Sequence, residues 1–163
     1  MDRKKIFEYA LQREHEGKRF FVQNADRLSN AAAQGAFKKL AEEEQRHIEF
    51  IEHQLRQLSQ GEVSSVEFGR ELEAVGFFSQ RAVSEDIDVT VAEAMVADLP
   101  VLRMAYLIER DFSEFYEMAA KISEGESKTV LEMLARWERT HETLFKKMHD
   151  RAFEEYAQMP WGG

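Results

Sequence analysis

Hydrophobic residues along most of this chain recur every three or four positions, which is the period of an amphipathic α-helix. The first such stretch covers residues 2–28, and the second covers residues 33–59 and ends before Gly61. Because the connection between them is short, the two helices should lie side by side and antiparallel. The pattern therefore predicts a helical hairpin over about residues 2–59.

The same arrangement is predicted again in the second half of the chain. A third helix is expected over residues 98–122, with Asp98 as its N-cap. A fourth helix is expected to start at Ser127 or Thr129 and to reach about Gln158. These two helices form a second predicted hairpin, over about residues 98–158.

The segment between the hairpins, about residues 60–97, is too rich in patterned apolar residues for a flexible linker. Ser65 is a candidate cap for one short helix, and Thr90 begins another that extends through Met95. A helix of about 27 residues is about 40 Å long, so a segment of this length can return to the starting end. We therefore predict one all-α domain over residues 1–163, in which two antiparallel hairpins are joined by a long, partly helical crossover. This is the connectivity of a ferritin-like four-helix bundle.

Composition supports this picture and narrows the function. Hydrophobic residues make up 44% and charged residues 33% of the chain, as in long amphipathic helices. The net charge of −9 argues against nucleic-acid or anionic-membrane partners, and no apolar run is long enough to span a membrane. With no cysteine, the chain contains no disulfide, thiolate metal site or nucleophilic thiol. The N-terminal residues lack a secretory apolar region, so we expect a cytoplasmic protein.

Residue types that bind metals occur twice in the same order. In the first half Glu14 is followed after 30 positions by Glu44, with His47 three further on. In the second half Glu109 is followed after 29 positions by Glu138, with His141 three further on. Glu-x-x-His alone is a weak signal in a chain so rich in glutamate.

The register of the two halves is the stronger signal. An offset of 95 residues aligns Glu14 with Glu109 and Phe21 with Tyr116, and an offset of 94 aligns the two Glu-x-x-His motifs. These correspondences indicate an internal duplication of a helical hairpin. His15, which adjoins Glu14, points about 100° away from it on a helix and is expected at the surface.

On a helix, positions i and i+3 lie on one face, so each Glu-x-x-His pair can reach one metal ion. Four carboxylates and two imidazoles from four helices are the ligands of a two-metal site. We expect Glu44 and Glu138 to bridge the metals and Glu14 and Glu109 to be terminal ligands. Four carboxylates balance the charge of two divalent ions. A ligand set without thiolate suits two iron ions, while manganese or zinc is also possible.

The residues around these ligands resemble the rubrerythrin-type branch of the ferritin-like di-iron carboxylate proteins. The resemblance is carried by four segments of the two hairpins: Gly17-Lys18-Arg19-Phe20-Phe21 after Glu14, Leu40-Ala41-Glu42-Glu43-Glu44-Gln45-Arg46-His47, Phe115-Tyr116 after Glu109, and Leu134-Ala135-Arg136-Trp137-Glu138-Arg139-Thr140-His141. It implies a bundle that binds two irons and reacts with hydrogen peroxide or dioxygen.

Two departures from that family are visible. Typical members carry a further Cys-ligated iron that feeds electrons to the di-iron site, and the absence of cysteine here implies a separate electron donor protein or ferrous iron itself. Typical members also have an additional glutamate on the third helix, where this chain has Phe112. The six-ligand set is thus more symmetric, as in bacterioferritin-like centres.

We also expect a homodimer or a higher homo-oligomer.

The resemblance favours a di-iron peroxidase or ferroxidase. Tyr116 is a candidate catalytic residue, and a role in tethering a ligand carboxylate is favoured over electron relay because Phe21 occupies the matching position. Glu42, Glu43 and Glu142 are expected to be solvated or to support the ligands, and Trp137 to pack in the core or between helices. Two other readings stay open: a ferritin-like iron-binding or storage protein, and a metal-stabilised helical module without turnover.

Overall fold

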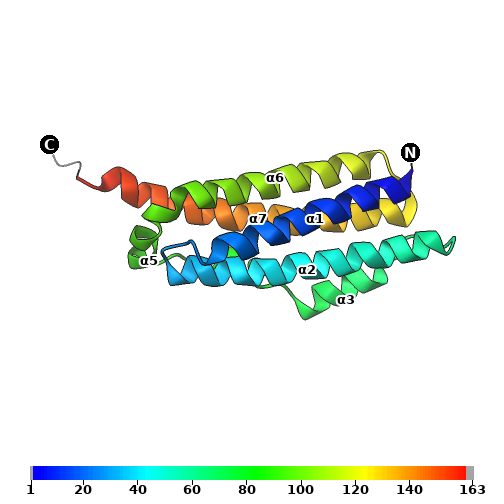
Figure 1. Ribbon diagram of the computed structural model, residues 1–163, viewed down its shortest axis with the longest axis horizontal. Coiled ribbons are helices and arrows are strands. Elements are labelled where there is room, and N and C mark those ends of the chain that lie inside the picture. The colour runs from blue at the N-terminus through cyan, green and yellow to red at the C-terminus, as the bar shows by residue number, and fades with distance from the viewer. Residues whose placement is uncertain (1, 161–163) are drawn as a thin grey trace.

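The computed structural model describes residues 2–160, and within that range it is built from α-helices without a strand. Figure 1 shows the elongated bundle that the sequence predicts. Its four long helices are α1 (Arg3–Ala25), α2 (Ala31–Ser59), α6 (Leu99–Lys121) and α7 (Gly125–Gln158). The all-α, ferritin-like fold class is therefore confirmed.

The ends of the first hairpin follow from local capping. Asp2 accepts a hydrogen bond from the backbone N–H of Lys4 and begins α1. The side chain of Asn30 accepts from the N–H groups of Ala32 and Ala33, at 2.9 and 3.1 Å, so α2 starts two residues earlier than the hydrophobic pattern indicated.

The crossover contains three short helices and a 3₁₀ turn: α3 (Glu67–Val75), α4 (Phe78–Ser84), α5 (Val89–Ala94) and η1 (Val96–Asp98). Figure 1 shows α3 lying along α2, and α5 at the far end of the bundle. The sequence predicted a helix near each end of this segment. It missed α4, which packs between α2 and α7.

The third helix starts where the sequence predicted, but its expected side-chain cap and the start of the fourth helix need correction. Asp98 stands at the N-cap position of α6, but its carboxylate caps nothing there. Instead it accepts hydrogen bonds from the N–H groups of Ser29 and Asn30, at 2.8 and 3.3 Å, and so ties the end of the crossover to the first hairpin turn. The fourth helix begins at Gly125, whose φ of 62° forms the turn after α6, and not at Ser127 or Thr129.

The apolar core is divided into two parts along the bundle. One part contains Phe7, Ile51 and Leu131, and the other contains Phe21, Phe37 and Phe145. A layer of buried carboxylates and imidazoles from all four long helices lies in the bundle interior as well. Within residues 2–160, no helix is both long and apolar enough to cross a membrane.

Candidate metal centre

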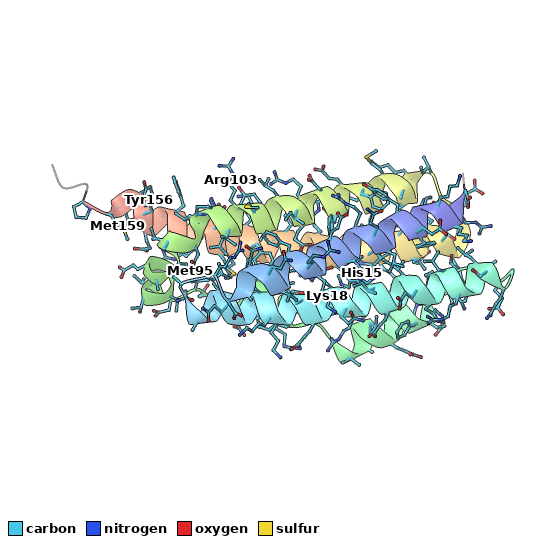
Figure 2. All side chains as sticks on the ribbon, in the orientation of Figure 1. His15, Lys18, Met95, Arg103, Tyr156 and Met159 are labelled. Atoms are coloured by element: carbon cyan, nitrogen blue, oxygen red, sulfur yellow. The ribbon has the colours of Figure 1, made fainter. Side chains whose placement is uncertain are left out.

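All six predicted ligands lie in the interior of the bundle, and each is at most 1% exposed. Helix α1 contributes Glu14, and α6 contributes Glu109. The other four come in pairs from one turn of a helix, Glu44 with His47 from α2 and Glu138 with His141 from α7. His15, the neighbour of Glu14, is exposed on α1, as predicted (Figure 2).

The six side chains form two overlapping groups. In each group the candidate ligand atoms lie within 4.8 Å of one another. One group consists of Glu14, Glu44, His47 and Glu138, and the other of Glu44, Glu109, Glu138 and His141. Because Glu44 and Glu138 belong to both groups, the arrangement is compatible with the predicted bridging role, which stays a prediction.

Both imidazoles turn the same ring nitrogen toward the carboxylates. The Nδ1 atom of His47 lies 2.7 Å from Glu138 Oε1 and 3.3 Å from Glu14 Oε2. The Nδ1 atom of His141 lies 3.0 Å from Glu44 Oε1 and 3.4 Å from Glu109 Oε2. Each histidine therefore offers one nitrogen to the shared space between the helices.

Several carboxylate oxygens in this space have no hydrogen-bond donor. They are Oε2 of Glu44, both oxygens of Glu109 and Oε2 of Glu138, while Oε1 of Glu138 has only the contact with Nδ1 of His47. Among residues 2–160, no lysine or arginine forms an ion pair with these glutamates; the ion-pair distances that they make are to His47 and His141. Buried anions without donors are costly unless a cation accompanies them. The donor set therefore fits a pair of divalent metal ions.

The pKa values of the buried groups also indicate that this site needs positive charge. Burial and the charges of Glu138 and Glu44 raise the pKa of Glu14 well above its ordinary value, and burial and the same two charges raise that of Glu109. Burial disfavours a charged His47, but the charge of Glu138 and the hydrogen bonds of Glu138, Glu14 and Glu44 together outweigh burial and raise the pKa of this imidazole. Without metal, bound protons would neutralise part of the negative charge that metal ions would otherwise neutralise.

The hydroxyl of Tyr116, on α6, donates a hydrogen bond to Oε1 of Glu14 on α1. The sequence favoured such a contact between Tyr116 and a candidate ligand carboxylate. Burial, followed by the negative charge of Glu14, raises the pKa of Tyr116, so the phenol stays protonated and able to donate. Phe21, at the matching position, packs in the core against Phe37 and Phe145.

Trp137 packs against the centre and not only within the core. Its indole stacks on the imidazole of His47, with ring centroids 5.1 Å apart and planes inclined by 29°. The indole N–H donates to Glu73 of α3 at 2.9 Å, so this ring joins the site to the crossover.

The three other glutamates near the motifs take different roles. Glu42 is exposed, whereas Glu142 pairs with Arg110 and Arg139 away from the site. Glu43 is buried and contacts His141 directly, at 2.7 Å from Nε2. The sequence contained one signal that Glu43 faces the site. It lies four residues before His47, and residues four apart share a helix face.

Ser79, in the first turn of α4, was not predicted at all. Its backbone N–H and its hydroxyl donate to the two oxygens of Glu43, at 2.9 and 2.7 Å. Nothing in the sequence pattern of the crossover distinguishes this serine from its neighbours. The crossover therefore supplies part of the site's surroundings, a role that the hairpin repeat could not reveal.

Fold and site together define a ferritin-like bundle with a paired carboxylate and imidazole centre. The rubrerythrin family model matches residues 5–98, which is more than half of the chain, so this chain belongs to the rubrerythrin family. That range includes Glu14, Glu44, His47 and the crossover. Glu109, Glu138 and His141 lie outside it and rest on the repeat and the geometry. No curated protein and no solved structure shows a significant match.

Proposed function

We propose that the protein is a non-haem di-iron oxidoreductase that uses bound iron to reduce hydrogen peroxide or dioxygen, as a peroxidase or ferroxidase. The observation that carries the proposal is the convergence of four buried carboxylates and two imidazoles from four helices. Four of their carboxylate oxygens have no hydrogen-bond donor, so a cation pair is needed for electrostatic balance. Membership of the rubrerythrin family supports the same choice.

The donor set favours iron among the candidate metals. Carboxylate oxygens and imidazoles without thiolate suit iron, and they also permit manganese or zinc. Glu14, Glu44, His47, Glu109, Glu138 and His141 would hold two ions. When bound, iron would supply electrons for the oxidant and a Lewis acid that polarises it.

The rest of the protein keeps the centre dry and fixes its ligands. Tyr116 holds Glu14 by donating a hydrogen bond to one of its oxygens. The rings of Trp137 and Phe77 lie against His47, at centroid distances of 5.1 and 6.0 Å. Because the six ligands are at most 1% exposed, the site is suited to an oxidant as small as peroxide or dioxygen.

The electron donor and the assembly belong to the same proposal. With no cysteine in these residues, we propose that electrons come from a separate donor protein or from further Fe(II). A homodimer or a higher homo-oligomer in the cytoplasm is the proposed setting.

The test is anaerobic loading of the metal-free protein with Fe(II), followed by absorbance spectroscopy as peroxide or dioxygen is added. Two irons per chain and rapid growth of ferric absorbance, faster with peroxide, are the expected results. Repeated turnover when a chemical reductant is supplied would establish an oxidoreductase. The matched control is the His141→Ala variant, which should lose this rapid phase.

Other outcomes would favour the alternatives. Slow oxidation, or uptake of far more than two irons per chain, would favour an iron-binding or storage protein. Two bound irons that do not respond to either oxidant would favour a metal-stabilised helical module. A preparation that binds no stoichiometric metal would overturn the proposal.

A further inference from the structure

The two halves of the centre have the same ligands but different neighbours. In the alignment of the repeat, Glu43 corresponds to Trp137, because each directly precedes a shared glutamate. Each of the two contacts the imidazole of the opposite half: Glu43 contacts His141, and Trp137 contacts His47. One histidine therefore faces a carboxylate, and the other faces an aromatic ring.

On the carboxylate side, further hydrogen bonds hold Glu43 in place beside His141. Glu43 is 2% exposed, and it accepts hydrogen bonds from the backbone N–H and the hydroxyl of Ser79. Because an ionised carboxylate only accepts, Nε2 of His141 must be the donor in their 2.7 Å contact. Because Nε2 keeps its proton, Nδ1 is the nitrogen that would release its proton and bind a metal, and the hydrogen bond to Glu43 makes this nitrogen a stronger ligand.

The aromatic side lacks any such support. The Nε2 atom of His47 is buried and has no hydrogen-bond partner. The indole N–H of Trp137 cannot provide one, because it donates to Glu73 instead. Placing the proton on Nε2, as metal binding at Nδ1 requires, therefore leaves a buried donor unsatisfied in His47.

The two terminal carboxylates, Glu14 and Glu109, also differ in how well they can bind a metal, and the difference again favours the half that contains His141. Glu14 accepts a hydrogen bond from the hydroxyl of Tyr116. This bond uses a lone pair of the carboxylate that could otherwise bind a metal. Phe21, which holds the position in α1 that Tyr116 holds in α6, has no hydroxyl to donate to Glu109, and both oxygens of Glu109 lack a donor. Glu109 is accordingly the better metal ligand of the two.

We propose that the two metal positions are unequal, and that the position of Glu109 and His141 binds the first ion more tightly than the position of Glu14 and His47. Glu43 and Tyr116 are the positioning residues that set this order, through His141 and Glu14 respectively. The inference rests on the two-metal centre of the proposed function but not on its reaction with an oxidant.

The experiment is a calorimetric titration of the metal-free protein with Mn(II), which needs no oxidant, accompanied by electron paramagnetic resonance. Two resolved binding steps are expected, with the signal of an isolated Mn(II) ion after one equivalent and a coupled pair after two. Anomalous scattering from a crystal grown with one equivalent should place that ion beside Glu109 and His141.

Two variants separate the two effects. Glu43→Gln should weaken the first step by about tenfold to a hundredfold, which is the usual cost of losing such a support, and leave the second nearly unchanged. Tyr116→Phe should instead strengthen the second step, because it releases an oxygen of Glu14. Glu42→Gln, on the exposed face of the same turn, is the matched control and should change neither step.

Three results would overturn the inference: two equal steps, a first ion beside Glu14 and His47, or a Glu43→Gln variant that affects both steps alike or neither. If Glu43→Gln does not fold, Ser79→Ala provides the same test with a smaller loss in the first step. Normal two-step binding without any reaction with peroxide or dioxygen would end the proposed function and leave this inference standing. A failure to bind Mn(II), Fe(II) or Zn(II) would end both.

Discussion

The indole of Trp137 stacks on the imidazole of His47, with ring centroids 5.1 Å apart, although the two residues lie in different halves of the repeat. The indole also packs against Phe50 and Phe77, at centroid distances of 5.3 and 5.2 Å. This ring therefore lies between the centre and the helices of the crossover. Its fluorescence would therefore report metal binding in the candidate centre.

We expect the fluorescence of Trp137 to fall when Fe(II) or Mn(II) binds beside His47. The measurement is a fluorescence titration in a Trp161→Phe background, which leaves Trp137 as the only tryptophan. Substituting His47→Ala in the same background should abolish most of the quenching. Quenching of equal size in both proteins would contradict the placement of the metal against this imidazole.

The second prediction concerns the shared glutamates. Replacing Glu44 or Glu138 by Ala should remove both metals, because each side chain belongs to both groups of candidate ligands. Replacing Glu14 by Ala should remove one at most. The measurement is metal content per chain after equilibration with Fe(II) under anaerobic conditions, with exposed Glu42→Ala as the control. Full occupancy in either the Glu44 or the Glu138 variant would refute the bridging assignment.

The third prediction concerns pH and the metal-free protein. Nearby carboxylates overcome the effect of burial and raise the pKa of His47 and His141, and burial itself raises the pKa of Glu14 and Glu109. These groups contribute stability that is fully present below their unfolded pKa and is lost as pH rises through the folded pKa. Burial opposes the charged form of Glu138 as well, but the charge of His47 and the hydrogen bonds of Glu109, His141 and His47 together outweigh burial and lower the pKa of Glu138. The contribution of Glu138 to stability is therefore lost as pH falls.

Above the ordinary histidine pKa of about 6.5, the metal-free protein should therefore lose stability as pH increases. Metal ions replace the lost protons, so the rise in melting temperature on adding Mn(II) should be larger at about pH 8 than at about pH 6. Thermal unfolding followed by circular dichroism, with and without metal, measures this difference. A constant or decreasing metal effect over that range would count against the centre described here.

The fourth prediction compares two glycines. A Cβ atom at Gly69 in α3 would lie 2.7 Å from Cε of Met133 and 2.8 Å from Cζ of Phe50, so Gly69→Ala forces the core to shift. We expect a loss of about 1–3 kcal/mol in the free energy of unfolding. A Cβ atom at Gly35 in α2 has open space around it, and Gly35→Ala should stabilise by about 0.5–1 kcal/mol. Denaturant unfolding measures both, and equal effects would contradict the packing of α3 on the bundle.

The sequence by itself determined the four long helices, their pairing into hairpins and the six candidate ligands. These depend on local periodicity and on the i, i+3 geometry of a helix, which any helix of this sequence would share. The repeat then identified Glu44, and not Glu42 or Glu43, as the partner of Glu138. Family membership over residues 5–98 agrees with this interpretation of the first hairpin.

Only the tertiary structure decided what surrounds those ligands. The contact of Glu43 with Ser79, the stack of Trp137 on His47 and the bonds from Asp98 to the first hairpin turn all join residues far apart in the chain. They depend on how the two hairpins and the crossover pack together, and no periodicity records that packing. The two halves of the repeat are alike in their ligands because helix geometry is local. They differ in their neighbours because matching positions hold different residues, Glu43 against Trp137 and Tyr116 against Phe21, and because the crossover places Ser79 beside Glu43 and Glu73 beside Trp137.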